Sequence, residues 1–130
     1  MITSKGFWRG RDVQYASELT PEIRKNAEDT IHKANLLLAR AGLILRDATS
    51  GWRPPAVNAG VKGAAKKSNH MLGRAVDIAD ADKQLQQWCL ANTKVLEEIG
   101  LWMEHPQDTP TWTHVQTVPP GSGRRIFNAR

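Results

Sequence analysis

Residues 68–77 read SNHMLGRAVD and hold two polar side chains, His70 and Asp77, in a stretch otherwise made largely of small and apolar residues. An ionised carboxylate on a buried strand is costly unless it is paired or binds a metal. Gly73 permits a tight turn or a close backbone approach, which would let His70 and Asp77 face each other. We therefore expect a buried strand over residues 75–78 that carries Asp77 into a polar site.

A second segment, residues 112–116, supplies another histidine. In a strand, Trp112, His114 and Gln116 share one face. The two segments together offer two imidazoles and one carboxylate, a three-ligand set that leaves the fourth position of a zinc ion open. Spacing alone does not separate such a set from two ordinary buried histidines and an aspartate that caps a turn, so both interpretations stay open at this point.

The strongest helical pattern lies between residues 20 and 42. Thr20 suits the N-cap, Pro21 suits the first helical position, and Gly42 supplies the C-terminal stop. Apolar residues recur between them at three- and four-residue spacing, which predicts one buried face. That face consists of Ile23, Ala27, Ile31, Ala34, Leu38 and Ala41.

The rest of the chain is expected to be mixed. Residues 1–19 show no period and are expected to be irregular. Residues 43–45 are expected to open a strand that residues 46–50 continue. Residues 51–68, rich in Gly, Pro, Ala and Lys, are expected to form a long functional loop. The remaining expected elements are helices over 82–90 and 93–99 and strands over 101–103, 112–116 and 125–127. This order predicts one α+β domain over residues 1–130, with a small antiparallel sheet and helices packed on one side.

Length and composition fit an ordinary globular domain. The chain has 130 residues, of which 40% are apolar and 24% are charged. No apolar run reaches the length of a membrane span, and no apolar segment near the first residues suggests a secretory signal, so we expect synthesis in the cytoplasm. The single cysteine, Cys89, excludes an internal disulfide and is expected to be an inert buried thiol.

The net charge of +5 suggests an anionic partner, either nucleic acid or a cell-wall surface. Lys62, Lys66 and Lys67 form one basic cluster, and Arg124 and Arg125 form another. Because no long basic stripe or recognition motif accompanies them, nucleic acid is not the expected partner.

Residues 68–77 resemble the S-x-H-x-x-G-x-A-x-D signature of the zinc D-Ala-D-Ala metallopeptidases. Residues 50–58 (SGWRPPAVN) resemble the family's S-x-[YW]-R segment, and residues 112–114 (WTH) resemble its W-x-H segment. The three segments occur in the family's order. The family includes D,D-carboxypeptidases, D,D-dipeptidases and phage endolysins, so the resemblance implies a hedgehog/DD-peptidase-like fold.

The resemblance implies that His70, Asp77 and His114 bind Zn²⁺ and that Arg53 reaches into the site as a catalytic residue. A guanidinium there can hold a substrate carbonyl or carboxylate and stabilise an oxyanion. A salt bridge between Arg53 and a surface carboxylate is the alternative. Ser68 is expected to shape the loop around the site.

The general base is the least determined residue. Many family members have Glu or Asp three residues before the last histidine, where this chain has Thr111. We expect Glu104, at the end of a strand, to act as the base, because apolar neighbours raise the pKa of a carboxyl group. Asp108, in a Pro-flanked turn, is the alternative base. His105 is expected to point away from the face that carries Glu104.

The resemblance implies a zinc-dependent peptidase that hydrolyses an amide bond in peptidoglycan stem peptides or cross-links, as a D,D-carboxypeptidase or an endopeptidase. We expect a monomeric phage or prophage lytic enzyme, delivered to the wall by a holin or in a virion. The alternative is a catalytically inactive cell-wall-binding or structural phage protein with the same fold. Thr111, at the position of the family's acid, motivates that alternative.

Overall fold

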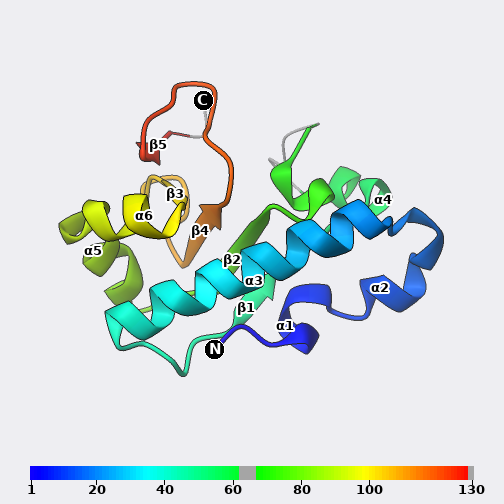
Figure 1. The fold of residues 1–130 in the computed structure, drawn as a ribbon, viewed down its shortest axis with the longest axis horizontal. Helices are drawn as coiled ribbons and strands as arrows, with labels where there is room; N and C mark the ends of the chain where they lie inside the picture. The colour runs from blue at the N-terminus through cyan, green and yellow to red at the C-terminus, as the bar shows by residue number, and fades with distance from the viewer. Residues whose placement is uncertain (62–66, 129–130) are drawn as a thin grey trace.

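A computed structural model describes residues 1–61 and 67–128 of the chain and places a five-stranded sheet at its centre (Figure 1). The sheet order is β1-β2-β4-β3-β5. All neighbours are antiparallel except β3 and β5, which are parallel. The predicted α+β class with a mainly antiparallel sheet is confirmed. The strands are β1 (Ala48–Ser50), β2 (Ala75–Ala79), β3 (Trp102–Glu104), β4 (Trp112–Gln116) and β5 (Ile126–Phe127).

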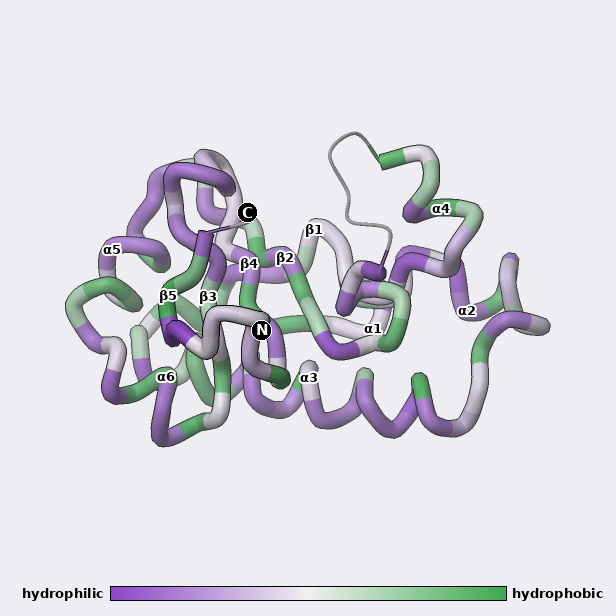
Figure 2. The backbone as a smooth tube through the Cα atoms, turned by 90° about the horizontal axis from the view of Figure 1, so that it is seen from above, coloured by the Kyte–Doolittle hydropathy of each residue, from purple (hydrophilic) through white to green (hydrophobic). Residues whose placement is uncertain are grey.

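The long helix α3 (Pro21–Ala41) packs along the sheet and has the predicted boundaries. The Thr20 hydroxyl accepts a hydrogen bond from the amide of Ile23, and Gly42 ends the helix with φ 71°. Figure 2 shows α3 running along one side of the molecule, with hydrophobic and hydrophilic stretches alternating along it. Its buried residues are Ala27, Thr30, Ala34, Leu37 and Leu38, while Ile23, Ile31 and Ala41 pack at the edge of the core.

Two shorter helices, α5 (Gln84–Ala91) and α6 (Thr93–Ile99), lie close to their predicted ranges. A buried carboxylate, Asp80, accepts hydrogen bonds from the first amides of α5 and from Arg46. These partners explain how a fully buried acid is tolerated there. Cys89 of α5 is buried, and burial raises the pKa of its thiol to about 12, in line with the expected inert thiol.

The prediction that residues 1–19 are irregular is wrong. They form α1 (Ser4–Trp8), α2 (Arg11–Gln14) and a 3₁₀ turn, η1 (Ala16–Glu18). Each element is too short to display a helical period in the sequence. Tertiary packing stabilises them instead, since Phe7 is fully buried in the core.

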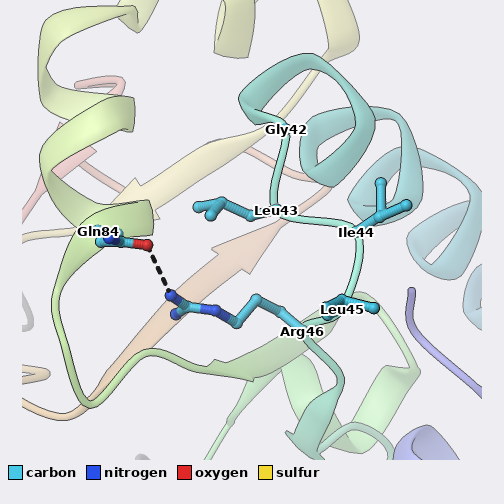
Figure 3. A pocket seen from close by; sticks show the side chains of 6 residues that line it. All are labelled: Gly42, Leu43, Ile44, Leu45, Arg46 and Gln84. Atoms are coloured by element: carbon cyan, nitrogen blue, oxygen red, sulfur yellow. Dashed lines mark hydrogen bonds between the residues drawn. The ribbon is translucent and has the colours of Figure 1, made fainter.

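The predicted start of the first strand at residue 43 is also wrong, since β1 begins only at Ala48, within the expected continuation over residues 46–50. Residues 43–45 make the turn that follows α3, and the amide of Leu43 bonds back to Leu38. Figure 3 shows this turn lining a pocket opposite Gln84. The side chain of Leu45 is 95% exposed. A short apolar run becomes a strand only where a neighbouring strand pairs with it, and none does so in the described chain.

The expected loop over residues 51–68 contains a further short helix, α4 (Pro55–Ala59). A 3₁₀ turn, η2 (Asn69–Leu72), then leads into β2. Residues 62–66, with Lys62 and Lys66 of the first basic cluster, lie outside the described residues. Among the described helices, none is long and apolar enough to cross a membrane.

One face of the β2–β4 pair packs against the hydrophobic core, and the other face is polar. Val76 and Ile78 of β2, with Val115 of β4, are fully buried in the core. Asp77 and His114 alternate with them and therefore lie on the opposite face of the sheet.

Candidate metal centre and active-site cleft

Strand pairing brings Asp77 and His114 together, because the two residues are direct partners in the β2–β4 register. His70 reaches the same point from η2, which immediately precedes β2. One potential ligand atom from each of the three side chains lies within 4.8 Å of the others. The structure thus brings together the three residues that the sequence analysis proposed as metal ligands.

Local geometry holds His70 in position. The Ser68 hydroxyl caps η2 by accepting the amide hydrogen of His70, as expected for a loop-shaping residue. Gly73 ends the turn with φ 73°, and a Cβ there would lie 2.8 Å from the carbonyl oxygen of Ile23 in α3. Only glycine combines this backbone conformation with so close an approach to α3.

The hydrogen bonds of His70 define which of its ring nitrogens faces the site. Its Nδ1 lies 2.7 Å from the carbonyl oxygen of Gly51. A carbonyl oxygen only accepts, so Nδ1 carries the hydrogen and donates it. The unprotonated Nε2 then lies 3.3 Å from Oδ1 of Asp77.

A similar arrangement orients His114, through a residue whose role the sequence analysis missed. Nε2 of His114 lies 2.9 Å from Oε1 of Gln116, whose amide nitrogen donates to the carbonyl of Val118. That second bond directs the Gln116 oxygen at His114, so Nε2 carries the hydrogen. Nδ1 of His114 is left facing Oδ1 of Asp77 at 2.9 Å. The available signal was the placement of Gln116 two residues along the same strand face.

Three electron-pair donors therefore converge when both histidines are neutral, and a cation is the group that satisfies all of them. Burial raises the pKa of Asp77, but the two imidazoles outweigh it and hold that pKa well below its usual range. Burial lowers the pKa of His70 more than Asp77 raises it. For His114, burial lowers the pKa, but the hydrogen bond and charge of Asp77, together with Gln116 and Glu104, outweigh burial and raise the pKa. Two nitrogens and one carboxylate oxygen fit a divalent metal of the zinc type.

We call His70, Asp77 and His114 the metal-ligand group. This group lies in an open cleft of about 1270 Å³. Glu104, Asp108 and Arg53 all line this cleft, whereas Thr111 is not among its lining residues. Two of the sequence's basic residues, Lys67 and Arg124, also line it. Arg125 instead stacks on Trp102, with its guanidinium carbon 4.2 Å from the ring centroid.

The two candidate bases occupy different environments within the cleft. Glu104 is partly buried at the end of β3, and burial raises its pKa; the charges of Asp108 and Asp77 raise it further, while His114 lowers it. Asp108 lies in the following turn, where its amide bonds to the carbonyl of His105. His105 is not among the residues that line the cleft.

Arg53 lies beside the ligands. Its backbone amide donates to the carbonyl of His70, and its Nη2 lies 3.4 Å from the Ser68 hydroxyl. Burial lowers the pKa of Arg53, whereas the charge of Asp77 raises it. Its Nε is buried without a hydrogen-bond partner, and within the described chain it makes no salt bridge to a surface carboxylate.

Gln116→Leu is expected to weaken metal binding about 10- to 100-fold, the usual cost of removing a partner that orients a metal-ligating histidine. The reason is that the His114 ring loses the acceptor that fixes its orientation. Zinc affinity measured by competition with a chromophoric chelator tests this. Gln107→Leu, a change in the same cleft at a residue with no bond to His114, is the matched control and should bind zinc as the native protein does. Equal affinity in both variants would contradict the role assigned to Gln116.

Comparison with known proteins adds family evidence to this geometry. The family model described as peptidase M15 matches residues 19–116, which include the three proposed ligands, Arg53 and Glu104. Neither the curated proteins nor the solved structures gave a match. The match confirms the resemblance seen in residues 50–58, 68–77 and 112–114, and it covers most of the chain. The protein therefore belongs to the peptidase M15 family.

Proposed function

We propose that the protein is a zinc-dependent peptidase that hydrolyses an amide bond in peptidoglycan stem peptides or their cross-links. The observation that carries this proposal is the convergence of His70, Asp77 and His114 in a cleft that also holds a carboxylate and a guanidinium. Membership of a peptidase family supports a peptide substrate. The family resemblance supports peptidoglycan as its source.

His70, Asp77 and His114 would hold the metal through Nε2, a carboxylate oxygen and Nδ1 respectively, the atoms that face one another in the structure. When bound, Zn²⁺ supplies Lewis acidity towards a carbonyl oxygen and lowers the pKa of water. The side chains around it provide the remaining chemistry.

Glu104 is the proposed general base. It would take a proton from the attacking water and later give that proton to the leaving nitrogen of the cleaved amide. Burial raises the pKa of Glu104, which favours the protonated form that donates in the second step. Arg53 would hold the substrate carbonyl or a neighbouring carboxylate and stabilise negative charge as it develops on oxygen.

The charges around the cleft suit an anionic peptide. Arg53, Lys67 and Arg124 line it, and the whole chain carries a net charge of +5. Such charge favours association with an anionic cell wall. We extend the proposal to a monomeric lytic enzyme of phage or prophage origin, made in the cytoplasm and delivered to the wall by a holin or in a virion.

The experiment that tests the proposal is release of free amino groups from purified peptidoglycan. Native protein is expected to release them, chelation to stop the release, and added Zn²⁺ to restore it. A chelated sample given Mg²⁺ is the control, because Mg²⁺ prefers an octahedral shell of oxygen ligands and should not restore activity. Zinc-loaded protein that binds sacculi without releasing amino groups would favour the inactive wall-binding protein instead.

A further inference from the structure

The first eighteen residues precede the span that the family model matches, yet they are firmly attached to the body of the protein. The amide of Ile2 donates to the side chain of Asn35 in α3. The amide and hydroxyl of Thr3 both donate to Asp47, at 2.9 and 2.7 Å. Asp47 immediately precedes β1, so these bonds hold α1 against the start of that strand.

Phe7, within α1, makes a close contact with Gly51. Phe7 is fully buried, and a Cβ placed on Gly51 would lie 2.5 Å from the carbonyl oxygen of Phe7. A side chain at position 51 would therefore force one of the two backbones to move. The ring of Trp8 adds an edge contact to Trp52, with centroids 5.9 Å apart.

Arg11 bonds to the residues on both sides of Gly51. Its Nη1 lies 3.1 Å from the carbonyl oxygen of Trp52 and 3.3 Å from the hydroxyl of Ser50. A guanidinium is planar and rigid, so one group can fix both partners at once. The peptide of Gly51 is thus held by Phe7 on one side and by Arg11 at its neighbours.

The carbonyl of Gly51 is the group that receives Nδ1–H of His70, at 2.7 Å. Arg11 therefore reaches the His70 ring through its bonds to Ser50 and Trp52, the peptide bonds that join these residues to Gly51, and the Gly51 carbonyl. An acceptor of this kind decides which ring nitrogen of a metal-ligating histidine is unprotonated and where it points.

We propose that residues 1–18 are a positioning element of the metal centre, with Arg11 as its central residue. Arg11 and Phe7 fix the Gly51 carbonyl, the carbonyl fixes the tautomer and orientation of His70, and Nε2 is thereby presented to the metal. The zinc part of this inference rests on the proposed function. The effect on the His70 tautomer does not depend on it.

The test compares Arg11→Met with Arg9→Met, a matched loss of an arginine whose side chain has no hydrogen bond to residues 50–52. In metal-free protein labelled with ¹⁵N-histidine, NMR reports which ring nitrogen of His70 carries the hydrogen. We expect Arg11→Met to lose the defined Nδ1–H state and to bind Zn²⁺ about 10- to 100-fold more weakly, as for other outer partners of metal ligands. Arg11→Lys, which keeps a donor, should recover part of both, and Arg9→Met should match the native protein.

A native His70 tautomer together with native zinc affinity in Arg11→Met would overturn the inference. If Arg11→Met does not fold, Arg11→Gln replaces it, because glutamine keeps a polar side chain but lacks the guanidinium that joins Ser50 and Trp52. Unchanged tautomer and affinity in that variant would equally overturn the inference. Native protein that shows the Nδ1–H tautomer but no peptidase activity would count against the proposed function alone.

Discussion

Asp77→Asn is expected to abolish both zinc binding and peptide hydrolysis while the protein stays folded. Oδ1 of Asp77 is the atom that both imidazoles face, at 3.3 and 2.9 Å. An amide removes the negative charge and offers a weaker ligand at the centre of the group. The loss of zinc affinity should exceed the roughly 10- to 100-fold cost of removing an outer partner such as Gln116.

Competition with a chromophoric chelator measures this affinity, and thermal unfolding checks the fold. Asp108→Asn is the matched control, since Asp108 lines the same cleft but is not a member of the metal-ligand group. Native zinc affinity in Asp77→Asn would place the metal elsewhere and remove the basis of the proposed function.

Glu104→Gln is expected to lower kcat about 10²- to 10⁴-fold, the usual contribution of a general acid–base group, with zinc affinity unchanged. Glutamine keeps the size of the side chain at the end of β3 but cannot accept the proton. Steady-state hydrolysis of peptidoglycan by zinc-loaded variants measures the effect. Asp108→Asn should retain most of the activity. Loss in Asp108→Asn with activity kept in Glu104→Gln would move the role of base to Asp108.

The pH profile gives a second test of Glu104. Only the carboxylate form accepts a proton, so activity should rise as pH increases through the pKa of Glu104. Burial raises that pKa, and the charge of Asp108 raises it further. Asp108→Asn should therefore shift the acidic limb of kcat/KM to lower pH. A bound cation also lowers the pKa of Glu104, because it favours the charged carboxylate. The absolute pKa therefore depends on the metal, and the test is the direction in which Asp108→Asn shifts the acidic limb. A shift to higher pH would contradict the arrangement.

Several features followed from local sequence alone. Thr20, Pro21 and Gly42 defined the ends of α3, because capping and φ preferences act within one turn. The alternation along residues 112–116 predicted which side chains share the cleft face, since the strand repeat is fixed at two residues. The motif in residues 68–77, read as a family resemblance, indicated the ligand set that the structure brings together.

Other features depended on contacts between segments distant in sequence. Residues 43–45 are apolar enough for a strand but have no pairing partner, and α1, α2 and α4 are too short to show a period. The bond from Gly51 to His70 joins residues nineteen positions apart, which no local pattern encodes. The sequence by itself determined the residue types and their alternation. Only the tertiary structure decided the β2–β4 register and the backbone approaches that orient each ligand, because both depend on packing and hydrogen bonds between distant segments.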